Sequence, residues 1–436
     1  MQTWMRGRRE MKINVETIAK CGGSCGGCML TQEERTGGTL LPQAGFAGHL
    51  PFVQAMVSSV GRDGDYTEVS INLGPADHLL APPERADEVV RWLKEAGGGR
   101  VAGFITASAV GKTERLKRAV DAWRAAVDRH RQAVCVDMVF DPSKTRLSQF
   151  HEQYAENISY IRAAFGAVDL NINVGPDTIE AVSPEALHAF MRENGFGNLT
   201  LNLIPTPQTA ERFAESWDAV TGWMVETMRA WCPDDRHGFN SCTAIAPYLE
   251  AADELLAQED FVPRLTAMIA EKASTELLLG PDGSICFSQA GFGDTPFAAR
   301  FGFAPAASTA GDPSDVRRRI RAAAERFAAR TVGAFLSTRA CAACPHMAVC
   351  PRTGLGVARR VMGGKLSPDA SGCPLRIRPA LDAMKEFMAV PRDMTTYDVS
   401  TSSIYVPAGF DTSLLPHAVA PPPNDAKVTF GPMGAV

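Results

Sequence analysis

The chain has 436 residues, of which 45% are hydrophobic and 21% are charged. This balance is typical of a globular protein with a sizeable core and excludes a mainly disordered chain. The formal net charge is −5, and no basic stripe interleaved with aromatic residues occurs, so we expect no nucleic-acid partner. There is no secretory h-region and no run of about 18 apolar residues, so we expect a cytoplasmic protein without a membrane partner.

The first half of the chain alternates between short apolar runs and segments with helical spacing. The predicted strands are Lys12–Ile18, Thr67–Leu73, Arg100–Thr106, Ala133–Phe140, Val168–Val174 and Asn198–Ile204. The predicted helices are Arg85–Glu95, Thr113–His130, Leu147–Phe165, Pro184–Asn194 and Thr209–Trp231. Six such units in succession predict a parallel sheet covered by helices, either as a doubly wound open sheet or as a partial barrel.

The pattern changes after residue 232. A helical region extends to about Ser274 and is followed by a β-hairpin of Glu276–Leu279 and Ser284–Ser288, joined by a Gly-Pro-Asp-Gly turn. A cysteine-rich segment follows, and the Pro-, Ser- and Thr-rich residues 391–436 predict an extended or partly disordered tail. We therefore expect a first unit at residues 12–232, a second unit at 233–390 and a tail.

Seven of the eleven cysteines fall into two tight groups, which favours metal binding over disulfides in a reducing compartment. Cys21, Cys25 and Cys28 directly follow the first predicted strand, where barrels and open α/β sheets place their chemistry. Three thiolates leave one iron of a four-iron cluster open, and the intervening glycines let the backbone wrap closely around it. Structural zinc requires four protein ligands, and no fourth Cys or His lies nearby in the sequence.

This C-x3-C-x2-C spacing after the first strand resembles the signature of the radical S-adenosylmethionine (SAM) superfamily. The resemblance implies that Cys21, Cys25 and Cys28 hold a [4Fe–4S] cluster whose open iron binds SAM. In that family one electron cleaves SAM to methionine and a 5′-deoxyadenosyl radical, which abstracts a substrate hydrogen atom. The implied fold is α/β, a partial (β/α)6 barrel of the TIM type with a C-terminal α+β auxiliary-cluster domain.

The resemblance also suggests SAM-binding residues at the ends of the strands. Gly74 lies where relatives carry a Gly-Gly-Glu-Pro-like turn that receives the SAM amine. Thr106 ends the third strand, and Asn171 and Asn173 lie on the fifth, so their polar groups can reach the ribose or carboxylate of SAM. The alternative is that these residues are solvated strand ends. Gly27 stands where relatives often have an aromatic residue, so adenine contacts must come from elsewhere.

The second cysteine group consists of Cys341, Cys344, Cys350 and Cys373, a complete ligand set for a [4Fe–4S] cluster or for zinc. The segment resembles the C-terminal SPASM or twitch extension of radical SAM enzymes, which implies a second, auxiliary [4Fe–4S] cluster held by all four. Gly354 replaces a further cysteine of a full SPASM domain. We expect the auxiliary cluster to transfer electrons or to stabilise the fold. Cys286 is interpreted as a buried small residue.

Other polar residues have no signal beyond their position, and the sequence assigns no catalytic residue. We interpret Asp77, His78, Asp137 and Asp141 as residues that could orient a substrate. Cys232 and Cys242 are interpreted either as a source of a radical-quenching thiol or as ordinary loop and core residues.

The first functional hypothesis is a radical SAM oxidoreductase or maturase that acts on a peptide or protein side chain. Its electrons would come from a reducing donor such as flavodoxin or ferredoxin. Only twenty residues precede Cys21, so we expect a peptide to dock elsewhere than on the amino-terminal winged-helix domain of many relatives. One alternative is a radical SAM dehydrogenase or epimerase of a small molecule such as an aminosugar or cofactor precursor. The other is a non-catalytic iron–sulfur or zinc scaffold.

Overall fold

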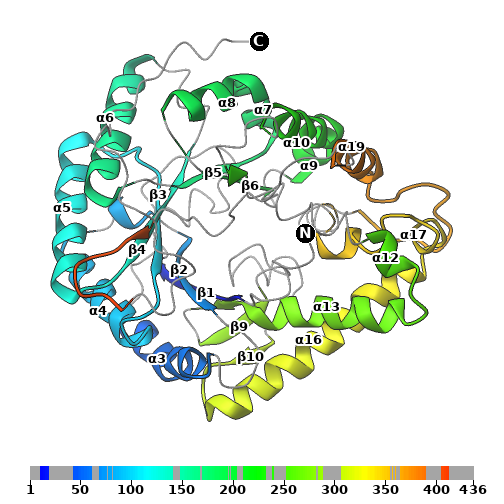
Figure 1. Ribbon diagram of the computed structural model, residues 1–436, viewed down its shortest axis with the longest axis horizontal. Helices are drawn as coiled ribbons and strands as arrows, with labels where there is room; N and C mark the ends of the chain where they lie inside the picture. Colours follow the sequence, from blue (N-terminus) through cyan, green and yellow to red (C-terminus); the bar gives the residue numbers. More distant parts are fainter. Residues whose placement is uncertain are drawn as a thin grey trace.

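A computed structural model of the chain describes residues 10–18, 43–60, 68–75, 77–80, 82–140, 148–166, 169–194, 196, 198–203, 210–231, 238–239, 252–280, 283–287, 306–353, 356, 359, 364–388 and 404–411. Its centre is one sheet with helices arranged around the outside (Figure 1). None of the described helices combines the length and the apolar character that a membrane span requires.

Among the described residues, seven parallel strands lie side by side in chain order. They are β1 (Glu10–Ile18), β2 (Glu68–Pro75), β3 (Gly103–Ala107), β4 (Val134–Val139), β5 (Asp169–Asn173), β6 (Asn198–Asn202) and β7 (Gly238–Phe239). Each strand pairs with the one before it, so the order never reverses, and right-handed crossovers place the connecting helices on one face. A doubly wound sheet reverses its strand order, so this topology is a partial barrel.

The helices between these strands form the outer layer of the barrel (Figure 1). They are α3 (Gln43–Ser58), α4 (Arg85–Ala96), α5 (Thr113–His130), α6 (Ser148–Phe165), α7 (Pro176–Ala181), α8 (Pro184–Glu193), α9 (Ala210–Glu215) and α10 (Trp217–Trp231), with the 3-10 turn η1 (His78–Leu80) after β2. Local signals set some helix ends. The hydroxyl of Ser183 accepts from the N–H of Ala186 at 3.2 Å, and Pro184 takes the first helical position.

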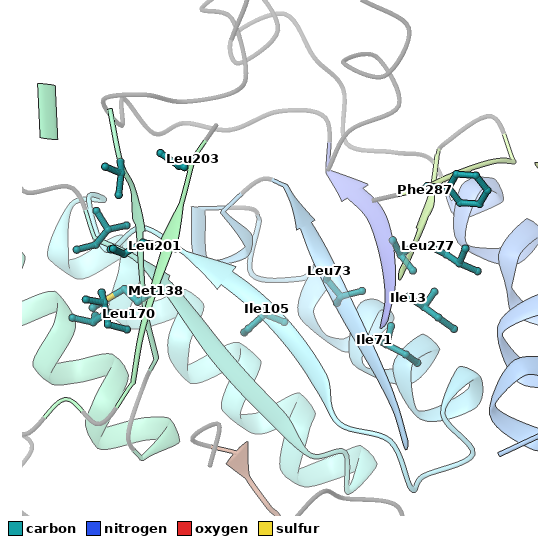
Figure 2. Packing of buried hydrophobic residues seen from close by; sticks show 14 of the residues in the cluster. Ile13, Ile71, Leu73, Ile105, Met138, Leu170, Leu201, Leu203, Leu277 and Phe287 are labelled. Carbon is teal, nitrogen blue, oxygen red and sulfur yellow. The ribbon is translucent and has the colours of Figure 1, made fainter. Parts of the chain in front are cut away.

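Alternation along the strands divides the sheet into two faces. Buried side chains such as Ile13, Ile71 and Ile105 pack in the main hydrophobic core between the sheet and the helices (Figure 2). The residues between them include polar side chains such as Asn14 and Asn72, which are half-buried on the opposite, inner face. The outer face therefore stabilises the barrel, and the inner face is left for polar groups.

The six predicted strands of the first half are confirmed within a few residues as β1–β6. The single helix predicted at Thr209–Trp231 is wrong in one respect, because the described part is split at Ser216 into α9 and α10. Trp217, at the start of α10, is fully buried, and its indole N–H donates to the carbonyl oxygen of Arg376 at 3.3 Å. Local spacing cannot predict this contact, because its two residues lie far apart in the sequence.

The predicted hairpin is confirmed as β8 (Glu276–Leu279) and β9 (Ser284–Phe287), which pair antiparallel. It does not stand apart from the barrel, since β8 also runs parallel to β1 and extends the same sheet beyond its first strand. The short strand β10 (Ala307–Ser308) pairs with β9. The remaining elements are α12 (Ala252–Leu256), α13 (Phe261–Thr275), α16 (Pro313–Leu336), α17 (Arg339–Ala342), η3 (Cys350–Arg352) and α19 (Arg378–Met388).

Part of the predicted tail is packed against the barrel. The strand β11 (Ile404–Tyr405) pairs antiparallel with the start of β4, where Ile404 lies opposite Cys135. Ile404 and Phe410 form a small buried cluster with Ala102, Ala133 and Cys135. Strand pairing and two apolar residues therefore hold residues 404–411 on the barrel, a contact that composition alone does not predict.

Candidate functional site

The carboxyl ends of parallel strands meet at one edge of the sheet, and this edge is the candidate site. β1 ends there at Ile18, and the chain reaches Cys21 three residues later. Cys21, Cys25 and Cys28 themselves lie outside the described residues, as do Asp141, Cys232 and Cys242. The first cysteine group therefore remains a prediction, whereas the neighbouring strand ends belong to the described part of the chain.

The strand register brings Gly74 and Thr106 next to each other. Leu73 pairs with Ile105, so the residues that follow them are neighbours at the end of β2 and β3. The Thr106 hydroxyl lies 3.4 Å from the carbonyl oxygen of Leu73, to which it donates, and this contact fixes the backbone beside Gly74. A Cβ added to Gly74 would meet no described atom within 4 Å. No described side chain therefore covers the half-buried Gly74 at the end of β2.

Asn171 and Asn173 lie on the same inner face, nearer the carboxyl edge than Thr106. Thr106 pairs with Asp137, whereas Asn171 pairs with Val139, two residues farther along β4. Both asparagines are half-buried between the fully buried residues of β5. The backbone of Asn173 is held because its carbonyl oxygen accepts from the Thr178 hydroxyl at 2.7 Å. The four predicted cofactor-binding residues therefore share one face and one edge.

Asp77 serves the fold in the turn after β2. Its buried carboxylate accepts from the N–H of Ser108 at 2.7 Å, from the Ser108 hydroxyl, and from the N–H of Leu79 at 2.8 Å. Burial raises the pKa of Asp77, and the hydrogen bonds from Ser108 oppose that rise. Since Ser108 directly follows β3, the carboxylate ties the ends of two neighbouring strands together. The interpretation of Asp77 as a substrate-orienting residue is not supported by this arrangement.

His78 and Asp137 differ in the faces that they occupy. His78 is fully buried, with its ring edge-on to Trp123 of α5 at a centroid distance of 5.8 Å, so it faces the helix layer. A substrate at the inner face would not reach it. Asp137 is half-buried on β4 between the buried residues Val136 and Met138, which places it on the inner face. Asp77, His78, Asp137 and Asp141 were the candidates for orienting a substrate. Among those that the structure describes, Asp137 is the one on the inner face of the sheet.

The second cysteine group lies between α16 and α19. Cys341 is in α17, Cys350 begins η3, Cys373 precedes α19, and none of the four cysteines forms a disulfide. Burial, together with the neighbouring Cys373 and Cys344, raises the pKa of Cys341 to about 11. Cys341, Cys344 and Cys373 are thus close enough to interact electrostatically.

Cysteine thiols that are buried or half-buried match the donor chemistry of an iron–sulfur cluster or of zinc, each of which binds the deprotonated form. In the described part of the chain, no three His, Cys, Asp or Glu side chains stand in an arrangement that could hold a metal ion. The ligand set Cys341, Cys344, Cys350 and Cys373 therefore stays a prediction. Cys286 is buried opposite Leu278 in the hairpin, as the sequence suggested.

Sequence reasoning missed a polar ladder across the inner face. The Asn72 amide donates to the side-chain oxygen of Asn14 at 3.1 Å, and the Asn14 amide donates to the carbonyl oxygen of Leu277 at 3.1 Å. These two bonds join β2, β1 and β8, and so connect the hairpin to the strand that leads to Cys21. A signal was present, because each asparagine interrupts an apolar strand at an alternate position.

These elements define an α/β protein with a partial barrel, an inner polar edge and C-terminal helices that carry four cysteines. No protein-family model matches the sequence, and a search of curated proteins finds no relative. A solved structure of hexahistidine-tagged anSMEcpe with bound AdoMet (SAM) is similar, with a TM-score of 0.50 and 10% identity, over 91% of this chain and 100% of that chain.

A structure of native anSMEcpe with bound AdoMet and the Cp18Cys peptide has a TM-score of 0.48 and 9% identity, over 87% of this chain and 96% of that chain. At such identities the likeness concerns the fold. It extends over nearly the whole of both chains in the first comparison. The predicted fold class, a partial (β/α)6 barrel with a C-terminal α+β region, is confirmed.

Proposed function

We propose that this chain is a radical SAM enzyme in which Cys21, Cys25 and Cys28 hold a [4Fe–4S] cluster with an open iron. When bound, that cluster supplies the electron that cleaves SAM to methionine and a 5′-deoxyadenosyl radical. One observation carries the proposal. The C-x3-C-x2-C sequence begins three residues after the first strand of a partial barrel, and the fold is that of an AdoMet-bound structure.

The strand ends contribute the groups that a SAM molecule requires. The SAM amine is a donor, and the backbone at Gly74, which no described side chain covers, would offer carbonyl acceptors. Amide side chains both donate and accept, so Asn171 and Asn173 suit the ribose hydroxyls or the carboxylate of SAM. Thr106 acts on the backbone of β2 through its bond to Leu73. Binding and orientation are thus the tasks of these residues.

The second cysteine group would hold an auxiliary [4Fe–4S] cluster through Cys341, Cys344, Cys350 and Cys373. Such a cluster, fully ligated by protein, suits electron transfer from a substrate radical or from a donor such as flavodoxin or ferredoxin. The resemblance to SPASM or twitch extensions favours oxidation or modification of a peptide or protein side chain. We expect this reaction to take place in the cytoplasm. A small-molecule dehydrogenase or epimerase is the second candidate, because half-buried polar residues of the inner face such as Asp137, Asn171 and Asn173 also suit a small polar substrate.

The test is SAM cleavage by the full chain after anaerobic reconstitution with iron and sulfide. We expect 5′-deoxyadenosine to form with dithionite as reductant, and Cys21→Ala to abolish its formation. Cys286→Ala is the matched control, since Cys286 is buried in the hairpin and outside both groups, and it should retain cleavage. Equal rates for Cys21→Ala and the parent chain would refute the proposal.

A further inference from the structure

A buried histidine lies within the second cysteine group. His346 stands between Cys344 and Cys350, and only 2% of its surface is exposed. Its Nε2 lies 2.6 Å from the Oδ1 atom of Asp382 on α19. A carboxylate can only accept, so Nε2 carries the shared hydrogen, and the orientation of the ring is fixed. The pair therefore joins the cysteine loop to the helix that follows Cys373.

The main chain of His346 contacts two of the predicted ligands. Its N–H donates to the sulfur of Cys344, and its carbonyl oxygen accepts from the N–H of Cys350 at 2.8 Å. Movement of His346 would thus displace both cysteines at once.

The other side of the pair is on the helix that follows the fourth cysteine. α19 begins at Arg378, five residues after Cys373, and the N–H of Arg376 donates to the carbonyl oxygen of Cys373 at 3.1 Å. Cys344 also interacts electrostatically with Arg378, Cys373 and Asp382. The contact between His346 and Asp382 therefore links the two chain segments that carry the predicted ligands.

We propose that His346, held by Asp382, is a positioning residue of the second metal site. It keeps the loop that carries Cys341, Cys344 and Cys350 against the segment that carries Cys373. The inference rests on the proposed function only in assigning a metal to these cysteines. Groups behind metal ligands typically change metal affinity by about 10- to 100-fold when they are removed, because the ligands lose their orientation.

The experiment compares variants of the full chain after anaerobic reconstitution with iron and sulfide. For His346→Ala and Asp382→Ala we expect an iron chelator to remove the second cluster about tenfold faster or more. Asp382→Asn retains an acceptor for Nε2 and should restore a rate near that of the parent. His130→Ala is the matched control, because it breaks another His–Asp contact, with Nε2 2.9 Å from Asp87, on helices that carry no cysteine.

Thermal unfolding of the metal-free variants separates metal loss from misfolding. Should His346→Ala fail to fold, Asp382→Ala carries the test, since that side chain is 48% exposed. Equal chelation rates for His346→Ala, Asp382→Ala and the parent would overturn the positioning role and leave the metal site intact. If Cys341→Ala binds as much iron as the parent chain, the second metal site itself is wrong, and the inference falls with it.

Discussion

Replacing Asp77 with alanine tests whether a buried carboxylate holds the edge at which SAM is expected to bind. The substitution removes the acceptor for the N–H groups of Ser108 and Leu79 and for the Ser108 hydroxyl. A buried donor left without a partner costs about 1–3 kcal/mol. The raised pKa of Asp77 shows that burial already opposes its charge, so we take the lower half of the range. The N–H of Leu80 also donates to this carboxylate at 3.2 Å but keeps the backbone carbonyl oxygen of residue 77 as an acceptor. Two backbone donors are therefore left without a partner, and we expect a loss of about 3 kcal/mol in the free energy of unfolding.

The assay is urea unfolding of the metal-free chain at pH 7. Asp87→Ala is the matched control, since Asp87 is 43% exposed and pairs at the surface with Arg129 and with the part-buried His130. Surface ion pairs contribute about 1 kcal/mol or less. A second readout is SAM binding to the reconstituted chain, which should weaken about tenfold for Asp77→Ala because the turn after Gly74 loses its anchor. A loss of stability no larger than that of the control would refute the reasoning.

Three further outcomes follow from the described contacts. Burial and a hydrogen bond to Asp128 raise the pKa of Tyr405 from 10 to about 12, so the stability from neutral Tyr405 is complete below pH 10 and is lost between pH 10 and 12. Below pH 10 we expect the parent to exceed Tyr405→Phe by about 1 kcal/mol in the free energy of unfolding, since the group is half-buried. Urea unfolding at a series of pH values should show this difference vanish between pH 10 and 12, and a constant difference would contradict the prediction. Phe410→Ala should cost about 3 kcal/mol in urea unfolding, and a loss below about 1 kcal/mol would mean that residues 404–411 do not pack on the barrel. Gly103→Ala should cost about 1–3 kcal/mol, because its new Cβ would lie 2.6 Å from a methyl group of buried Leu93; an unchanged midpoint would show that Leu93 moves freely.

Local periodicity was sufficient for most strands of the barrel. The apolar runs around Ile13, Ile71 and Ile105 predict strands because a side chain at every second position packs against helices. Periodicity could not distinguish a doubly wound sheet from a barrel, because that choice depends on the strand order of the assembled sheet. For the same reason the sequence did not reveal that β8 joins β1 or that Ile404 pairs with Cys135.

Some features of the candidate site could likewise be predicted from the sequence, whereas others depend on tertiary contacts. Spacing along the chain places Gly74 and Thr106 at strand ends, and the register then shows that they are neighbours. Roles that depend on distant partners were not predictable. Asp77 binds Ser108, and His346 binds Asp382, and nothing in the local sequence pairs these residues. Sequence therefore indicates where chemistry is expected, whereas contacts show which polar residues are already used by the fold.

The open iron at Cys21, Cys25 and Cys28 is the central claim, and electron paramagnetic resonance tests it most directly. The reconstituted chain carrying Cys341→Ala, which isolates the first cluster from the second group, would be reduced with dithionite and measured before and after addition of SAM. We expect SAM to change the spectrum of the reduced cluster, because it occupies the vacant coordination position. A spectrum that saturating SAM leaves unaltered would contradict the claim.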